Sequence, residues 1–216
     1  SKIEKVIETV DGEITEATLM TTGISVTGVS DSQSIKMQNE ASVVNAAPTS
    51  INDGAITING NVTMEMEDSS SIIFSDSAVN KYNGIAVGIN NSLVMKDNSK
   101  IENSSNGIYL RSLSNIEMQD FAKIVNASDY GVYFNEYAMG SFRMNMNNNA
   151  NDGDSAKIEA ANGFYFGTNK QMDIYMGKHA LVSRGDESKM GSGIYYRYDG
   201  YSPSVTQQFH MMDYSR

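Results

Sequence analysis

Short runs of alternating apolar and polar residues follow one another along the chain, separated by glycine, asparagine and serine. The clearest run, the first motif, is a glycine followed by apolar, variable and apolar residues, as in Gly107, Ile108, Tyr109 and Leu110. Alternation of this kind predicts short β-strands that bury one face. The first motif begins at Gly23, Gly54 (with one extra residue), Gly84, Gly107, Gly131, Gly163 and Gly193. Recurrence every 23 to 32 residues predicts a repeat protein.

Two further motifs lie between successive copies of the first. The second motif places a variable residue between an apolar residue and, in most copies, methionine; its copies are centred on Lys36, Thr63, Val94, Glu117, Arg143, Asp173 and His210. The third motif, a small residue, a variable residue and Ile or Val, is centred on Lys100, Lys123, Lys157 and Leu181. Each repeat therefore holds three short strands joined by turns.

Three short strands in a repeat of this length are typical of one coil of a parallel β-helix. Stacking each strand on its equivalent in the next coil, ~4.8 Å away, builds a long sheet from strands that are too short to be stable alone. The pattern predicts an all-β fold, a right-handed single-stranded parallel β-helix (solenoid) of about seven coils. We expect residues 1–216 to form a single domain.

The repeat also predicts which residues fill the core and the corners. The methionines expected to share one inward column are Met37, Met64, Met95, Met118 and Met144. Each glycine of the first motif is expected to open a tight corner with positive φ. The last copy of the second motif, 209–211, is not followed by a third motif, so we expect a fragment of a longer solenoid. Open ends of a solenoid favour self-association.

Alternation places the middle residue of the first motif outside, which aligns a tyrosine in four consecutive repeats: Tyr109, Tyr133, Tyr165 and Tyr195. Such a row has two interpretations. It is a candidate ligand-binding platform, since sugar rings lie well on aromatic faces. Alternatively, the rings stack on one another and stabilise the parallel strands.

Charged residues occupy the middle of the other two motifs. Lys100, Lys123 and Lys157 would repel one another unless Glu102 and Glu159 compensate, and a solvated edge is expected. In the second motif, Glu117, Arg143 and Asp173 are either a surface salt-bridge row or a catalytic row. The catalytic alternative sets Glu117 and Asp173 two rungs apart, ~9–10 Å, near the carboxylate separation of inverting glycosidases, with Arg143 holding an anionic sugar.

Composition narrows the range of functions. The 16 basic and 26 acidic residues give a formal net charge of −10, which disfavours nucleic acid as a partner. Cysteine is absent and only His179 and His210 are present, so neither a Cys/His metal site nor a thiol nucleophile is expected. Acidic segments at 65–68 and 152–154 are candidates for calcium binding, but neither matches a known calcium loop. We therefore expect solvated turns there and no metal or cofactor.

Membrane and export signals are equally sparse. No apolar run reaches the roughly 18 residues that a transmembrane helix needs, so we expect no membrane span in this segment. Residues 1–10 alternate charged and apolar residues, unlike a signal peptide, so we expect an excised mature segment.

Residues 92–110 (SLVMKDNSKIENSSNGIYL) and 115–134 (NIEMQDFAKIVNASDYGVYF) resemble repeats of bacterial surface-protein β-helices, including autotransporter passengers and adhesin-like proteins. The resemblance extends over about residues 13–200. Those families usually carry two or three glycines where this chain has one, so its corner is expected to be built differently.

This resemblance implies a bacterial protein that is secreted or displayed on the cell surface. It implies a non-catalytic, adhesin-like binding or display module, with a host glycan or surface protein as partner. Some β-helices are polysaccharide lyases or hydrolases, and such an enzyme is the alternative, because fold alone does not decide function.

Overall fold

The computed structural model describes residues 24–27, 32–44, 46, 48, 50, 52–74, 82–147, 156–166, 172–177, 180–184, 192–196 and 207–211. Within these ranges the fold is all-β, with parallel strands and no helix. It follows that no described segment is a helix able to cross a membrane.

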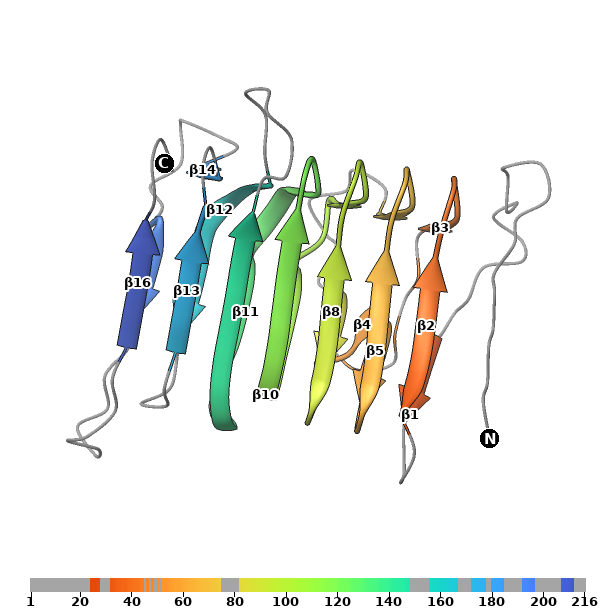
Figure 1. The fold of residues 1–216 in the computed structure, drawn as a ribbon, viewed down its shortest axis with the longest axis horizontal. Helices are drawn as coiled ribbons and strands as arrows, with labels where there is room; N and C mark the ends of the chain where they lie inside the picture. Colours follow the sequence, from red (N-terminus) through yellow and green to blue (C-terminus); the bar gives the residue numbers. More distant parts are fainter. Residues whose placement is uncertain are drawn as a thin grey trace.

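The strands form three parallel ladders, each of which joins equivalent strands of successive repeats (Figure 1). The first ladder contains β1 (Ile24–Thr27), β4 (Gly54–Asn59), β7 (Asn83–Val87), parts of β10 (Asn106–Gln119), β11 (Lys123–Asn147) and β12 (Lys157–Phe166), and β15 (Ile194–Tyr196). The second contains β2 (Gln33–Met37), β5 (Val62–Met66), β8 (Asn91–Met95), parts of β10 and β11, β13 (Met172–Met176) and β16 (Gln207–Met211). The third contains β3 (Ser42–Val44), β6 (Ser71–Ile73), β9 (Lys100–Glu102), parts of β11 and β12, and β14 (Leu181–Arg184).

Apolar side chains from all three ladders meet in one core. Ile56 from the first ladder, Met66 from the second and Ile72 from the third are fully buried members of it. Long strands such as β10 and β11 continue from one ladder into the next, which unites the strands into one curled sheet. The three motifs thus correspond to the three ladders, as the spacing predicted.

The expected methionine column is correct at three of its five positions. The observed column contains Met37, Met66, Met95, Met118, Met146, Met176 and Met211. Met64 and Met144 lie in the neighbouring inward column, where Met64 pairs with Ile35 and Met144 with Ile116. The prediction for these two was wrong because β5 and the end of β11 carry apolar residues at three alternate positions. A shift of two residues keeps the same face inward, so alternation alone did not fix the register.

The turn after the second ladder marks the register. An asparagine or aspartate follows each of the first four methionines of this column by two residues and has φ between 55° and 58°. These four residues are Asn39, Asp68, Asp97 and Asp120. Asparagine and aspartate tolerate this left-handed conformation better than other non-glycine residues. The Asp68 carboxylate accepts a hydrogen bond from the Asn39 backbone N–H (2.9 Å), and the Asp97 carboxylate accepts one from Asp68 N–H (3.1 Å). The first three of these turns are therefore tied to one another.

The glycines of the first motif do not form positive-φ corners, contrary to expectation. Among the described glycines, positive φ occurs at Gly60, outside the motif. Gly107 is needed because its backbone approaches the next repeat closely. A Cβ there would lie 2.3 Å from Ile124 Cγ2 and 2.7 Å from the carbonyl oxygen of Gly131. Gly23, the first copy, lies outside the described residues.

A column of small buried residues precedes the third ladder: Ala41, Ser70, Ser99, Ala122, Ala156 and Ala180. The hydroxyls of Ser70 and Ser99 are buried without a hydrogen-bond partner. Burial of an unsatisfied hydroxyl costs free energy that alanine avoids.

We expect Ser99→Ala to raise the free energy of unfolding by about 0.5–1 kcal/mol, measured by urea denaturation. Ser114→Ala is the control, since that buried hydroxyl donates to the carbonyl oxygen of Gly88 (3.0 Å) and its loss should destabilise by about 1 kcal/mol. A destabilised Ser99→Ala variant would contradict this account of the corner.

Candidate binding site

The four tyrosines of the first motif stand in register in one column of the first ladder, as predicted. Tyr109 and Tyr133 stack with ring centroids 5.4 Å apart and an interplanar angle of 3°. Tyr133 and Tyr165 follow at 4.5 Å and 2°, and Tyr165 and Tyr195 at 5.3 Å and 10°. The column is a continuous stack of parallel rings.

Stacking leaves little of the ring faces for a ligand. Tyr109 is 6% exposed and Tyr165 is 8% exposed, whereas the last ring, Tyr195, is 46% exposed. Tyr130 packs at a tilt against Tyr133 (5.5 Å) and Tyr165 (5.1 Å), and burial raises the pKa of its hydroxyl. The expected row of four solvent-facing rings is therefore not what the structure shows, because Tyr109 and Tyr165 are buried and Tyr133 is half-buried. This geometry favours the self-stacking interpretation of the column.

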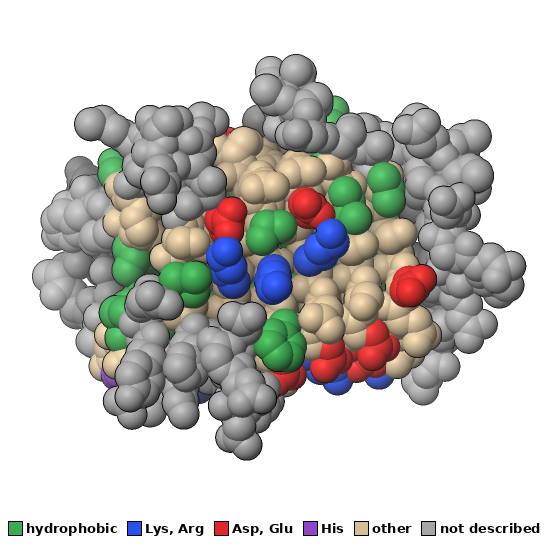
Figure 2. All heavy atoms as spheres, turned by 90° about the horizontal axis from the view of Figure 1, so that it is seen from above, with side chains coloured by type: hydrophobic (Ala, Val, Ile, Leu, Met, Phe, Trp, Pro, Cys, Tyr) green, Lys and Arg blue, Asp and Glu red, His purple; other side chains and the backbone are tan. Residues whose placement is uncertain are grey.

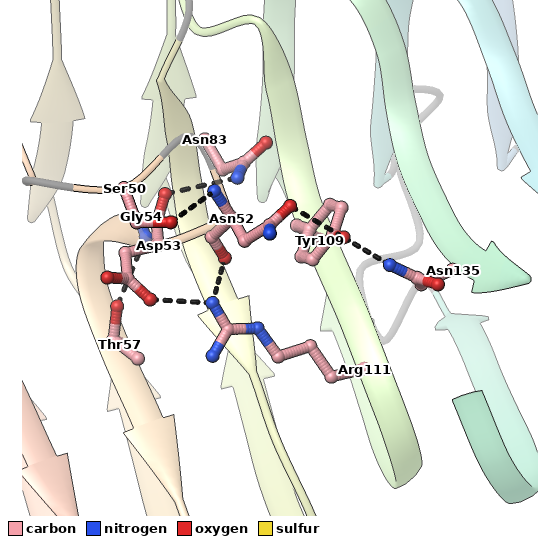
Figure 3. A network of polar contacts seen from close by, with 9 residues as sticks. All are labelled: Ser50, Asn52, Asp53, Gly54, Thr57, Asn83, Tyr109, Arg111 and Asn135. Carbon is pink, nitrogen blue, oxygen red and sulfur yellow. Dashed lines mark hydrogen bonds and ion pairs between the residues drawn. The ribbon is translucent and has the colours of Figure 1, made fainter. Parts of the chain in front are cut away.

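At the N-terminal end of the stack the column changes from tyrosine to Ala86, which points outward yet is fully buried. The segment that leads into β4 lies next to this point and reaches Tyr109, two repeats further on (Figure 3). The Tyr109 hydroxyl donates to Asn52 Oδ1 (3.1 Å) and accepts from the side-chain amide of Asn135. Residues far apart in sequence thus meet around one phenol group.

Arg111 holds the same segment from the other side. Its guanidinium donates to the carbonyl oxygen of Asn52 and forms an ion pair with Asp53 Oδ1 at 2.6 Å. The guanidinium carbon also lies 5.9 Å from the centre of the Tyr109 ring. Around these groups is an open depression of about 440 Å³, lined by Ser50, Asn52, Asp53, Tyr109, Arg111 and Asn135.

This depression brings together hydroxyl, amide, carboxylate, phenol and guanidinium groups, which are the kinds of group that hydrogen-bond to sugars. The side chains of Arg111 and Asp53 are 35% and 32% exposed, so the guanidinium retains donors and the carboxylate an acceptor for a ligand. Their mutual ion pair fixes both groups before a ligand arrives, which lowers the entropy cost of binding. Sequence reasoning singled out Tyr109 but missed the other residues. Nothing local in the sequence indicates that Asn52 and Asp53 contact residues two repeats further on.

The row of Glu117, Arg143 and Asp173 is not one column. Arg143 and Asp173 are neighbours, with their charged groups 3.9 Å apart, but Glu117 pairs with Asn145 in the adjacent column. Glu117 and Asp173 are separated by two strand spacings across the ladder and by two residues along the strand. Their Cα atoms are therefore about 11–12 Å apart. The two carboxylates therefore do not stand two rungs apart in one column, which is the arrangement that the catalytic alternative assumed. The misplacement has the same cause as that of Met144, a register shift of two residues.

The lysine row lies on the outer face of the third ladder, where Figure 2 shows basic side chains in a line between acidic and apolar ones. Lys100 forms an ion pair with Glu102 (2.6 Å), and Lys157 forms one with Glu159. The expected compensation by these two acids is thus confirmed. Lys123, between them, has no ion pair within the described part of the chain.

The acidic segment 65–68 is more than a solvated turn. Glu67 is buried and receives Lys36 Nζ and Lys96 Nζ, each at 2.6 Å, together with the side-chain amide of Gln38. These partners come from the preceding and following repeats, so Glu67 links three repeats. No group of three or more potential metal ligands occurs among the residues described, while Asp152, Asp154 and His179 lie outside them.

Glu67 makes the stability of the fold depend on pH in the acidic range. Burial alone would raise the pKa of its carboxyl, but hydrogen bonds from Lys36, Lys96 and Gln38 outweigh burial and lower the pKa from 4.5 to about 2. A depressed pKa contributes stability that is present above about pH 4.5 and is lost as the pH falls toward 2. We expect the urea midpoint to fall over this range, and to fall less in Glu67→Gln. Parallel curves for both proteins would refute this role of Glu67.

Comparison with known proteins returns no relative: no protein-family model, curated protein or solved structure matches this chain. The likeness to bacterial surface repeats is therefore one of motif alone.

Proposed function

We propose that this chain is a right-handed single-stranded parallel β-helix of about seven coils that serves as a non-catalytic, adhesin-like binding module. The three in-register parallel ladders and their common core support the helix. The motif resemblance supports a bacterial protein that is secreted or displayed on the cell surface. In this role the tyrosine stack stiffens the scaffold and the polar depression beside Tyr109 binds the ligand.

The ligand of this proposal is carbohydrate, such as a host glycan. The observation that carries it is the preorganised set of amide, carboxylate, guanidinium and phenol groups around the depression. Amides and phenols both donate and accept hydrogen bonds, as sugar hydroxyls do. The exposed acceptor of Asp53 and donors of Arg111 strengthen such bonds because bonds to charged groups are the stronger ones.

A glycan array probed with the whole chain, followed by calorimetry on the best glycan, tests this function. Asp53→Asn keeps the shape of the side chain but removes the charge, and we expect it to weaken binding about tenfold or more. Asp120→Asn is the matched control, because Asp120 sits in a turn of the second ladder and asparagine tolerates its φ of 55°. Binding of no glycan, or equal affinities of both variants, would overturn the proposal. Turnover of a bound polysaccharide would instead favour the lyase or hydrolase alternative.

A further inference from the structure

A second hollow lies on the outer face of the second ladder, on a different face from the depression beside Tyr109. It measures about 340 Å³, and every residue that lines it is serine, threonine or asparagine. The column Ser34, Thr63, Ser92 and Asn115 follows it over four consecutive repeats. At ~4.8 Å per strand these groups form a straight row of ~14 Å along the axis of stacking.

The floor of this hollow is held rigidly by the fold. Asn91 is buried, accepts a hydrogen bond from Val62 N–H (3.0 Å) and donates to the carbonyl oxygen of Ile58 (3.3 Å). Ser114 is also buried and donates to the carbonyl oxygen of Gly88. Asn61 and Asn90 border the hollow at corners with φ of 54°. The backbone beneath the row is therefore fixed.

The groups on the row keep their hydrogen-bonding capacity. Within the part of the chain that the structure describes, the side chains of Thr63, Ser92 and Asn115 bond to no other residue. Hydroxyls and amides each donate and accept. Lys36 and Glu65, in the next column, lie 3.7 Å apart and offset each other's charge. The residues that line the hollow carry no charge, and Arg143 stands in the same column one rung beyond Asn115. A neutral ligand rich in hydroxyls finds a regular row of hydrogen-bonding partners along Thr63, Ser92 and Asn115.

We infer that this hollow is a second binding site, which takes a neutral oligosaccharide lying along the row of Thr63, Ser92 and Asn115. With Ser34 at its end the row spans three strand spacings, so affinity should grow from the monosaccharide to a short oligosaccharide and then level off. Binding should depend little on salt, because none of the residues that line the hollow is charged. This inference does not depend on the depression at Tyr109.

The test uses the whole chain and a series of neutral hexose oligosaccharides of increasing length, measured by calorimetry at low and high salt. The double variant Thr63→Val with Ser92→Ala removes two free hydroxyls from an outward face and should weaken binding roughly tenfold. Ser42→Ala is the control, since Ser42 belongs to the third ladder, away from the hollow.

The outcomes separate the two sites. Loss of affinity in the double variant with Asp53→Asn unaffected supports this site even if the proposed function at Tyr109 fails. Unchanged affinity of the double variant for every neutral oligosaccharide overturns the inference and leaves the Tyr109 proposal standing. Binding of an extended neutral peptide, lost in the double variant, with no oligosaccharide bound would also overturn it. A steep fall of affinity with salt would show that charges, and not this row, bind the sugar.

Discussion

Replacing Gly107 with alanine is expected to lower the free energy of unfolding by about 3 kcal/mol or more. The new Cβ would lie 2.3 Å from Ile124 Cγ2 and 2.7 Å from the carbonyl oxygen of Gly131. Ile124 is fully buried and its methyl branches from Cβ, so it cannot swing away. The two repeats must separate at this point, which weakens the parallel pairing on both sides. Urea denaturation followed by far-UV circular dichroism measures the change.

Gly193→Ala is the matched control for this prediction. Gly193 occupies the same place in its repeat, yet a Cβ there meets no atom within 4 Å. Its substitution should alter the free energy of unfolding by no more than about 0.5 kcal/mol. Equal effects at Gly107 and Gly193 would show that close approach between repeats is not why the first motif carries glycine.

Tyr165→Ala is expected to cost about 3 kcal/mol of stability. Tyr165 is buried, stacks on Tyr133 at 4.5 Å and Tyr195 at 5.3 Å, and meets the tilted ring of Tyr130 at 5.1 Å. Its removal deletes these aromatic pairs and leaves a gap in the column. The measurement is again the midpoint of urea denaturation, with the dependence of the unfolding free energy on urea concentration unchanged.

Tyr195→Ala serves as the comparison, because Tyr195 is 46% exposed and stacks on a single ring of the column. We expect a loss below about 1 kcal/mol there. If both substitutions were nearly neutral, the stack would contribute little to the fold, and its alignment would need a ligand to explain it.

The sequence predicted the strands and their order well because alternation and turn residues act locally. The outward positions of the first and third motifs, such as Tyr109 and Lys123, pair as their spacing predicted. The register of Met64 and Met144 was missed because alternate apolar positions permit two alignments. The Asn or Asp two residues after the correct methionine, such as Asp68, was the local signal that decides it.

The candidate binding site was harder to predict because it depends on contacts across repeats. Asn52 and Asn135 reach Tyr109 from 57 and 26 residues away in sequence, and no periodic pattern includes them. The burial of Tyr109 likewise follows from the neighbouring segment and not from its motif. Serines and threonines of the second ladder, such as Ser92 and Thr63, were visible only as turn-forming or variable residues. Their alignment over four repeats becomes apparent once the register is known.

The central claim is that the tyrosine stack stabilises the scaffold while the polar depression beside it binds carbohydrate. The most direct test measures glycan affinity and urea midpoint on the same samples of Tyr165→Ala and Asp53→Asn. The account predicts that Tyr165→Ala loses about 3 kcal/mol of stability and keeps its affinity, while Asp53→Asn keeps its stability within about 1 kcal/mol and loses affinity about tenfold or more. A stable Tyr165→Ala protein that no longer binds, beside an Asp53→Asn protein that binds normally, would contradict it.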